Sequence, residues 1–418
     1  MSKAKKMLVF HSAYTYENLK QLGLEIFVQS RDAGNFFENI LTVSPVASLQ
    51  YPQEDSRKFS SPEYFQLDRR NLILEGRLAR YYFLRRFKNL NFIFAQISLL
   101  VALISKGKLR EVDLVRGEDP RFNGIYAYLA SRILRKPLVI GLWGNPGRIR
   151  KLNGKPIAPR LFASMRMEEK VETFILNRAD IVLAQNAENM SYAIQLGVDT
   201  SRTRITPLGV GIDKAHFAQL RDRMDVSSDI QAWQIKNEFL LFCISRLESL
   251  KMVDHAIRAC TVLKEAQISF KIVLIGEGRE RKNLENLANQ LDLNENVIFA
   301  GNRSQEWIAG LMSRADLNIA PLCGRALLEA SLSGCPAVSY NVDWHSEIVK
   351  SGVTGELVDN LDFVALGEAA KKILLDENLR KDMRKKMLKL ANYLANPARI
   401  TEEQVAIYSE LVQYQKNK

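Results

Sequence analysis

Short apolar segments alternate with helix-forming segments along most of this 418-residue chain, and this alternation constrains the fold more than any other feature. Short runs rich in Val, Ile, Leu and Phe are typical of strands that are buried on both faces of a parallel sheet. In the first half, the expected strands are residues 6–11, 40–44, 112–115, 137–142, 181–184 and 204–207. In the second half, they are residues 239–244, 271–275, 297–300, 317–320 and 337–340.

The alternation stops once, at the sequence LGVGID of residues 208–213, and the polar stretch that follows it has no strand character. We therefore predict an α/β protein of two doubly wound, Rossmann-like domains, residues 1–208 and 209–397. Such sheets bind ligands at the carboxyl ends of their strands, so the residues just after each strand form the candidate site. Further expectations are a helix at 16–29, a loop at 51–64 and a final helix at 401–415.

The chain carries 59 Lys and Arg against 47 Asp and Glu, a formal net charge of +12. Such an excess suits an anionic partner, which could be nucleic acid, an anionic membrane face or a phosphorylated substrate. The cysteines have neither zinc-site nor disulfide-framework spacing, which fits a reducing cytosol. The basic N-terminus runs straight into a strand, unlike a signal peptide. The most apolar run, 91–104, is shorter than the ~20 residues of a membrane-spanning helix.

Residues 69–88 form the most basic region, in which Arg and Lys are interleaved with aromatic and aliphatic side chains. A helix of this composition can lie at an anionic membrane surface. The alternative is an ordinary surface helix with a solvated basic face. A nucleic-acid groove fits less well, because no nucleic-acid-binding motif accompanies the charge.

Two cations follow the first strand of the second half. Arg246 and Lys251 lie five positions apart between that strand and the next helix, and both could point toward a bound ligand. A guanidinium that binds bidentately and an ammonium that acts as a point charge suit a diphosphate. Taken alone, they could equally be surface cations on a loop. Gly276 and Gly278 follow the next strand and would allow a flat ligand to approach closely.

The stretch 316–347 reads as strand, tight loop, helix, strand and loop. Gly324 permits a sharp turn, and the helix expected at 325–333 would direct backbone N–H groups toward an anion. Glu329 lies about one and a half turns into that helix, where its carboxylate could accept hydrogen bonds from a ribose. An ordinary crossover with a solvated Glu329 is the alternative.

As an ordered set, these residues resemble the retaining, nucleotide-sugar-dependent glycosyltransferases of the family-four type, which have the GT-B fold. The resemblance covers roughly residues 110–412. The matching positions are Arg246, Lys251, the GEG of 276–278, Val297, Phe299, Gly301, Ala315, Asp316, Glu329, Ala330, the GCP of 334–336, Glu347, Gly352, Gly355, the ADIV of 179–182 and the PLGV of 207–210.

The resemblance implies two domains that face a central cleft, with residues 398–418 crossing back to the N-terminal, acceptor-binding domain. Its catalytic residues would be Arg246, Lys251 and Glu329, with Arg246 and Lys251 neutralising the departing nucleoside diphosphate. Donor contacts would come from Gly276, Gly278, Arg303, Cys323, Gly324, Arg325 and Leu328. The acceptor or sugar side would hold His11, Trp143, Asn145 and His345. Neither a metal nor a cofactor is expected besides the donor, a UDP- or GDP-sugar.

The chain departs from the family pattern at three places. Pro321 stands where the family has a second glutamate, and Trp143 stands where it often has a catalytic histidine. The sequence HSAYTY of residues 11–16 replaces a glycine-rich loop.

From the resemblance and the basic region together, we expect a cytosolic glycosyltransferase of cell-surface polysaccharide synthesis, peripheral on the inner membrane face, with a glycan or lipid-linked acceptor. The alternatives are a non-catalytic nucleotide-binding protein, a nucleotide-sugar epimerase or hydrolase, and, third, a nucleic-acid binder.

Overall fold

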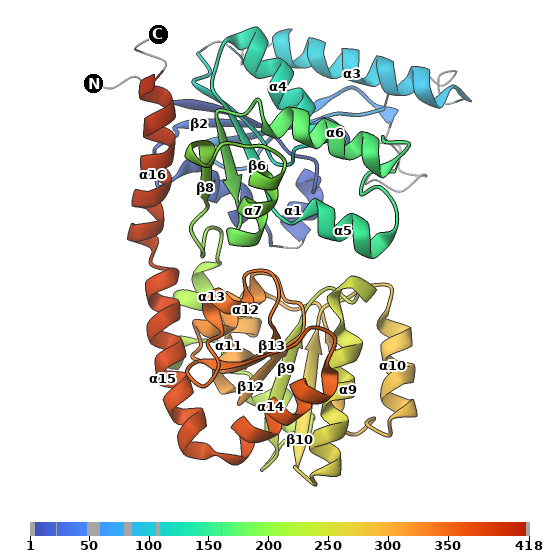
Figure 1. Ribbon diagram of the computed structural model, residues 1–418, viewed down its shortest axis with the longest axis vertical. Helices are drawn as coiled ribbons and strands as arrows, with labels where there is room; N and C mark the ends of the chain where they lie inside the picture. The colour runs from blue at the N-terminus through green and yellow to red at the C-terminus, as the bar shows by residue number, and fades with distance from the viewer. Residues whose placement is uncertain are drawn as a thin grey trace. The chain divides into compact units, whose positions relative to one another are not determined.

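The computed structural model describes residues 5–21, 23–47, 59–78, 86–105, 109, 111–159 and 161–414. The chain forms two compact units (Figure 1). Unit 1 consists of Met1–Gly211 and Ala398–Lys418, and unit 2 consists of Ile212–Pro397. The division falls within the LGVGID segment in which the alternation stops.

Unit 1 contains an eight-stranded sheet in the order β3-β4-β2-β1-β5-β6-β7-β8, in which only the edge strand β3 is antiparallel to its neighbour. The strands are β1 (Lys6–Phe10), β2 (Asn39–Ser44), β3 (Glu63–Gln66), β4 (Asn71–Glu75), β5 (Leu114–Gly117), β6 (Leu138–Leu142), β7 (Ile181–Ala184) and β8 (Thr203–Ile205). The helices are α1 (Tyr16–Gln21), α2 (Ile26–Gln29), α3 (Lys88–Ser105), α4 (Phe122–Leu134), α5 (Pro146–Asn153), α6 (Met165–Leu176), α7 (Ala187–Gln195) and α16 (Pro397–Tyr414).

The strands of unit 1 place alternate side chains in two cores, one on each face of the sheet. Leu8 and Phe10 of β1 join the core under α3, α4, α6 and α7, whereas Met7 and Val9 join the core under α16. Tyr408 of α16 is buried in that second core, and its hydroxyl accepts a hydrogen bond of 2.6 Å from Arg116. The C-terminal helix therefore packs on the N-terminal sheet, as the resemblance implied.

One prediction for unit 1 is wrong, because the region predicted as a basic helix contains strand β4, which pairs in parallel with β2. Arg77 is buried and forms an ion pair of 2.8 Å with Glu75, so it does not belong to a solvated face. The segment predicted as a loop lies outside helices and strands at residues 60–62, but its last two residues, Glu63 and Tyr64, begin strand β3. Residues 51–58 and 79–85 lie outside the described residues. The helix predicted at 16–29 is two short helices, α1 and α2.

Unit 2 contains a six-stranded parallel sheet in the order β11-β10-β9-β12-β13-β14. Its strands are β9 (Phe239–Ile244), β10 (Phe270–Ile275), β11 (Val297–Gly301), β12 (Leu317–Ala320), β13 (Ala337–Tyr340) and β14 (Gly355–Val358). Its helices are α8 (Ser227–Ala232), α9 (Val253–Glu265), α10 (Arg281–Gln290), α11 (Gln305–Arg314), α12 (Ala326–Ser331), α13 (His345–Ile348), α14 (Phe363–Leu375) and α15 (Glu377–Leu394).

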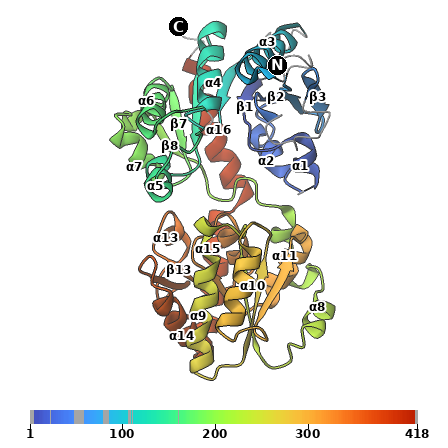
Figure 2. The same cartoon turned by 90° about the vertical axis from the view of Figure 1, so that its right-hand side faces the viewer.

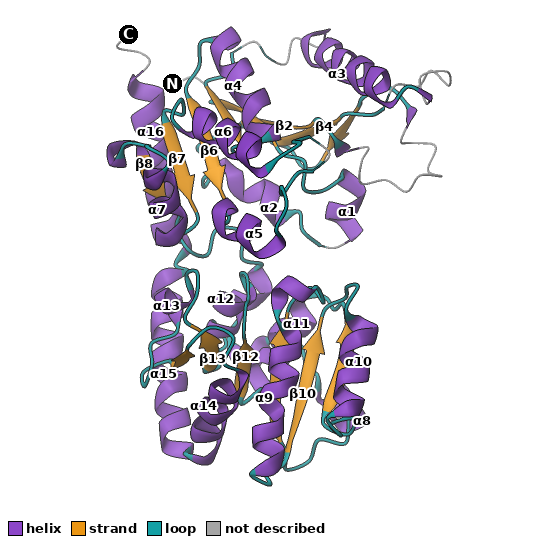
Figure 3. Cartoon of the chain, turned by 45° about the vertical axis from the view of Figure 1, so that its right-hand side comes forward, coloured by secondary structure: helices purple, strands orange, loops and turns teal. Residues whose placement is uncertain are grey.

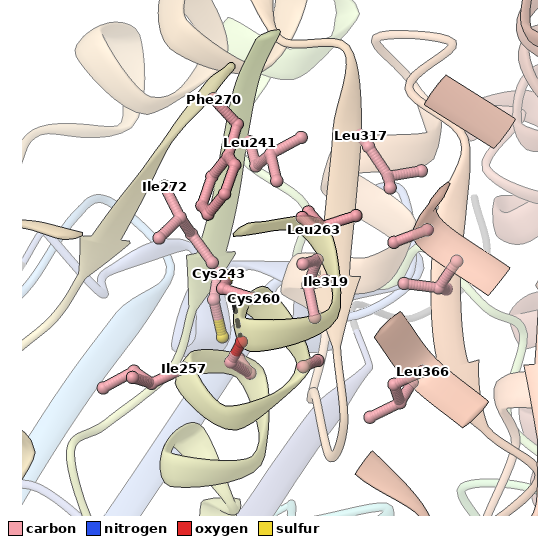
Figure 4. Close-up of a cluster of buried hydrophobic side chains, with 14 of the residues drawn as sticks. Leu241, Cys243, Ile257, Cys260, Leu263, Phe270, Ile272, Leu317, Ile319 and Leu366 are labelled. Carbon is pink, nitrogen blue, oxygen red and sulfur yellow. Dashed lines mark hydrogen bonds between the residues drawn. The ribbon is translucent and has the colours of Figure 1, made fainter. Parts of the chain in front are cut away.

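Helices cover both faces of this second sheet (Figures 2 and 3). Figure 4 shows the core beneath α9 and α14, where Leu241, Phe270, Ile272 and Leu317 of the strands meet side chains of the helices. The opposite core, beneath α11 and α12, includes Trp307, Leu311 and Ala330. Cores on both faces leave the strand ends as the part of the sheet where polar side chains gather.

Candidate functional site

The sheet of unit 2 reverses its winding between β9 and β12, which are neighbours although two strands separate them in sequence. In doubly wound sheets, ligands bind in the crevice outside the carboxyl ends of the strands at such a reversal. The loops that follow these two strands are residues 245–252 and 321–325, and both carry residues singled out from the sequence. Topology therefore brings the predicted cations and the predicted loop to the same edge.

The first loop presents Arg246 and Lys251. Arg246 is exposed, and Lys251 is half-buried in a 3-10 turn, Ser249–Lys251, that leads into α9. Burial lowers the pKa of Lys251 below its ordinary value; Arg246 adds to this effect, and Cys323 and Asp343 oppose it. Within the described part of the chain, neither cation has a hydrogen-bond or salt-bridge partner for its side chain. Two neighbouring cations without an anionic partner favour an anionic ligand.

Gly276 and Gly278 support this loop through the backbone. A Cβ atom at Gly276 would lie 2.1 Å from the carbonyl oxygen of Ser245, and one at Gly278 would lie 2.1 Å from that of Leu247. The Leu247 N–H donates a hydrogen bond of 3.0 Å to the carbonyl oxygen of Glu277. We expected these glycines to let a ligand approach closely. Instead, the neighbouring loop packs against them, and they thereby position Arg246.

Gly324, in the second loop, is different. A Cβ atom there would meet nothing within 4 Å, and its φ is not in the left-handed region, so the turn itself does not require glycine. The neighbouring Cys323 has its Sγ atom 3.6 Å from the carbonyl oxygen of Ile244, which ties this loop to the end of β9. Open space above Gly324 is the arrangement that a phosphate approaching the backbone needs.

His345 supports the second loop from the interior of unit 2. It is the first residue of α13 and fully buried; its Nε2 atom donates to the carbonyl oxygen of Cys323 at 3.1 Å. Its Nδ1 atom lies 2.6 Å from the hydroxyl of Ser339. The expectation that His345 faces the sugar is therefore wrong, because both ring nitrogens are engaged inside the fold.

Glu329 is 7% exposed, which excludes the solvated carboxylate that an ordinary crossover would have. Its Oε1 atom lies 3.7 Å from Nε of Arg325, and its Oε2 atom lies 4.0 Å from Nε2 of His216. The helix that carries it, α12, has six residues, shorter than the predicted helix. Since a short helix has a small dipole, the charges of Arg246, Lys251 and Arg325 dominate the potential at this edge.

His216 was missed by the sequence analysis, because the polar stretch around it has no strand or helix pattern. Its Nε2 atom lies 2.9 Å from Oε1 of Gln305, and the ring is buried. Arg223 fixes the same segment, donating to the carbonyl oxygens of His216 at 2.7 Å and Leu332 at 3.0 Å. A His three residues after the LGVGID segment was the available signal.

Two predicted donor residues lie apart from this group. Arg303 follows β11 and is exposed, and its guanidinium lies over the ring of Trp307 at 4.9 Å. Leu328 is buried within α12, so its side chain points into unit 2. In the described residues, no group of three or more His, Cys, Asp or Glu side chains is arranged to hold a metal ion. Metal independence remains a prediction.

In unit 1 the winding reverses between β1 and β5, and here His11 and Trp143, two of the residues predicted for the acceptor side, belong to an ion network. Glu118, directly after β5, is buried; its Oε2 atom accepts hydrogen bonds from Nε1 of Trp143 at 2.6 Å and from Arg116 at 3.2 Å. Its Oε1 atom lies 3.1 Å from Nε of Arg31. Burial would raise the pKa of Glu118, but the charges of Arg116 and Arg31 outweigh it and lower the pKa to about 2.

His11 belongs to the same network, and Glu118, which the sequence analysis missed, links it to Trp143. Arg31 donates to Nδ1 of His11 at 2.9 Å, so the proton of the neutral ring lies on Nε2. Burial and the charge of Arg31 lower the pKa of His11 to about 3. Trp143 remains 39% exposed at the edge of this network.

Asn145 has a structural role that the sequence analysis did not assign. Its side chain caps α5, accepting from the backbone N–H of Arg148 at 3.0 Å, with Pro146 at the first helical position. Its amide nitrogen donates to Glu188 at 3.0 Å. This is a typical helix start, in which an Asn cap precedes Pro. It is separate from the Glu118 network in its contacts.

Comparison with known proteins identifies the second unit. Residues 225–389 match the family model of glycosyl transferases group 1. Relatives include N-acetyl-alpha-D-glucosaminyl L-malate synthase of Bacillus anthracis, 25% identical over 44% of this chain and 48% of the relative. Another is alpha-D-kanosaminyltransferase of Streptomyces kanamyceticus, 23% identical over 62% and 66%. The matched stretches thus span about half to two thirds of these two relatives.

Solved glycosyltransferase structures share the fold of the whole chain. HepE of Anabaena, crystallised with UDP-glucose, superimposes with a TM-score of 0.70 at 20% identity, covering 97% of this chain and all of HepE. WaaG, described as a glycosyltransferase of lipopolysaccharide biosynthesis, gives a TM-score of 0.64 at 17% identity, covering 95% and 98%. The group 1 domain thus lies within a GT-B fold, as the sequence predicted.

Proposed function

We propose that the protein transfers a sugar from a UDP- or GDP-sugar to a glycan or lipid-linked acceptor, with retention and without a metal. The observation that carries the proposal is the pair Arg246 and Lys251, cations without a salt-bridge partner in the described chain, beside the open backbone of Gly324. The group 1 match over residues 225–389 supports this assignment, as does a GT-B neighbour that binds UDP-glucose.

Unit 2 would act on the donor. Arg246 would bind the diphosphate bidentately and Lys251 would add a point charge, so both would stabilise the negative charge that develops as the sugar leaves. Glu329, oriented by Arg325 and His216, would accept hydrogen bonds from the ribose hydroxyls. In a retaining reaction, the acceptor hydroxyl attacks from the face that the diphosphate leaves. Arg303 and Leu328 would contribute secondary donor contacts.

Unit 1 would bind the acceptor through Trp143, together with Asn145, which also follows β6, and His11, which follows β1. Trp143 is held by Glu118 and remains partly exposed, and an indole ring offers an apolar face on which a sugar can stack. We place the reaction in cell-surface polysaccharide synthesis, in the cytosol at the inner membrane face. The structural neighbour WaaG is described as a glycosyltransferase involved in lipopolysaccharide biosynthesis, which supports the placement in polysaccharide synthesis.

The first test is calorimetric titration with UDP, GDP, ADP and their sugars. We expect one nucleotide to bind, and Arg246→Ala combined with Lys251→Ala to weaken it about 100- to 10,000-fold, since each charge-assisted contact contributes roughly 1.5–3 kcal/mol. Arg258→Ala with Lys264→Ala removes the same charges from the surface of α9 and should leave affinity unchanged. Absence of binding by any nucleotide would overturn the proposal.

Product analysis then separates the alternatives. A transferase releases nucleoside diphosphate only when an acceptor is present, whereas an epimerase or hydrolase changes the donor without one. Nucleotide binding with no turnover in any acceptor mixture would identify a non-catalytic protein, which the departures at Pro321 and Trp143 motivate.

A further inference from the structure

Helix α3 of unit 1 has two apolar faces, and only one of them is covered. Asn91, Ala95, Leu99 and Leu103 are buried against the unit 1 core. Seven other large apolar side chains are each 48% to 60% exposed: Leu90, Ile93, Phe94, Ile97, Leu100, Val101 and Ile104. At about 100° per residue, these seven fall within an arc of about 120° directly opposite the buried four.

The orientation of this helix is fixed by its contacts. The hydroxyl of Tyr64 donates to the carbonyl oxygen of Ala102 at 2.8 Å, and the hydroxyl of Tyr126 in α4 donates to Gln96. Phe92 packs against Phe122 of α4 with ring centroids 6.1 Å apart. Figures 1 and 3 show α3 lying outside the sheet beside α4. The exposed arc therefore faces away from unit 1, and the contacts of the helix hold it in this orientation.

The apolar surface continues onto α4. Leu129 and Ile133 are 52% and 78% exposed, and they share a helix face with Phe122 and Tyr126, the residues that contact α3. We call the seven α3 residues with Leu129 and Ile133 the α3–α4 surface. Monomeric soluble proteins rarely expose a contiguous apolar patch of this kind without a binding partner.

The charged residues of α3 and α4, and the one just before α3, are all cations. The sequences of α3 and α4 contain no Asp or Glu. Arg86 precedes α3, and Arg132 and Arg135 lie at the end of α4; all three are exposed. Cations that border an apolar strip match the structure of an anionic bilayer, in which phosphates border acyl chains.

We infer that the α3–α4 surface docks the protein on a bilayer containing anionic phospholipids, with α3 lying in the plane of the membrane. No helix in the described chain is long and apolar enough to cross a bilayer, and one face of α3 is buried against the core of unit 1. A protein partner fits less well, because interface cores favour Tyr, Trp, Arg and Met over the Leu, Ile and Val found here. The inference goes beyond the proposed transfer reaction and does not depend on it.

The test is co-sedimentation of the full chain with phosphatidylglycerol-containing vesicles, without nucleotide or acceptor. We expect Ile97→Glu with Val101→Glu to reduce vesicle binding at least tenfold. Val364→Glu with Leu375→Glu, at comparably exposed positions of α14 in unit 2, should leave it unchanged. Replacing the anionic lipid by phosphatidylcholine should weaken binding about fivefold for each cation engaged. Failure of the nucleotide screen would not affect these results.

A second measurement does not depend on the folding of the charged variant. The four native cysteines are buried, so a polarity-sensitive fluorophore can be attached at Ile97→Cys and, as a control, at Val364→Cys. The label at position 97 should shift to the blue when vesicles are added, and the label at position 364 should not. An unshifted label, equal binding by the Ile97/Val101 variant, or a dimer that this variant dissociates would each overturn the inference; the last would assign the surface to a second copy.

Discussion

The two sheets share one topological feature but pair their charges differently. Each reverses its winding once, and each gathers charged side chains at the strand ends of that reversal. In unit 1, Glu118 lies between Arg31 and Arg116 and accepts from Trp143, so each cation of this buried cluster has an anionic partner. In unit 2, Arg246 and Lys251 have no salt-bridge partner within the described chain.

This difference indicates what each edge can bind. In unit 1 the two guanidiniums already share the Glu118 carboxylate, so on the proposed function the group left for an acceptor is the neutral, amphipathic ring of Trp143. An excess of positive charge, in contrast, makes unit 2 attractive to a diphosphate before any contact forms. The proposed function would thereby separate recognition of a polar, uncharged molecule by unit 1 from recognition of an anion by unit 2.

The largest expected effect comes from removing the charge of Glu118. Glu118→Gln leaves Arg31 and Arg116 buried together without an anion, which should cost about 3–5 kcal/mol of unfolding free energy. Arg246→Gln with Lys251→Gln relieves repulsion instead and should change stability by less than ~1 kcal/mol. Urea unfolding of both variants makes the comparison, with Glu188→Gln, a half-buried partner of Arg148, as the control.

Acid should reproduce this loss in the wild type. The pKa of Glu118 falls from 4.5 to about 2 on folding, so its stabilisation is complete above 4.5 and is lost as pH falls toward 2. His11, whose pKa falls from 6.5 to about 3, acts in the same direction, because the unfolded state binds its proton first. If Glu118→Gln unfolds like the wild type across this range, the network does not stabilise unit 1.

The sequence predicted unit 2 better than unit 1 for a physical reason. Strands 239–244, 317–320 and 337–340 were predicted at their observed bounds, because they are buried on both faces and read as continuous apolar runs. Strands β3 and β4 lie at one side of the other sheet and carry the polar residues Glu63, Gln66 and Asn71. Their apolar pattern is weaker, and the basic residues around them led us to predict a helix instead of a strand.

The sequence did not predict which side chains of the site contact one another. Arg246 and Lys251 follow a strand directly, so topology alone places them. Glu118 and His216 depend on partners 25 and 89 residues away, Trp143 and Gln305, and spacing carries no signal for such contacts. The role of His345 was misjudged for the same reason, since its partner Cys323 lies on another loop.

A smaller effect distinguishes the glycines around the donor site. Gly278→Ala places a Cβ atom against the Leu247 backbone and should cost about 2–3 kcal/mol of stability. Gly324→Ala meets open space and should leave the unfolding free energy within ~0.5 kcal/mol of wild type, yet weaken nucleotide binding. Thermal unfolding and calorimetry on the same two variants test this. Unchanged nucleotide affinity in Gly324→Ala would remove that loop from the donor site.

The smallest effect is a pH dependence of donor affinity, and it comes from Lys251. Burial and Arg246 lower its pKa in the free protein, and a bound diphosphate would raise it again, so binding above the lowered pKa must take up a proton. Affinity should therefore be constant at lower pH and fall by up to ~10-fold per pH unit once pH exceeds the lowered pKa. The nucleotide phosphates themselves are fully ionised above about pH 7.5 and contribute no slope there.

Lys251→Arg provides the matched control, because a guanidinium keeps its proton throughout this range. Calorimetric titrations from about pH 7.5 to about pH 10 should show the fall in wild type and a flat profile in the variant. A slope that survives in Lys251→Arg would assign the titration to another group. A flat wild-type profile would mean that Lys251 does not contact the diphosphate, leaving Arg246 and Arg325 as the cations that recognise the anion and making the two reversals less different than their charges suggest.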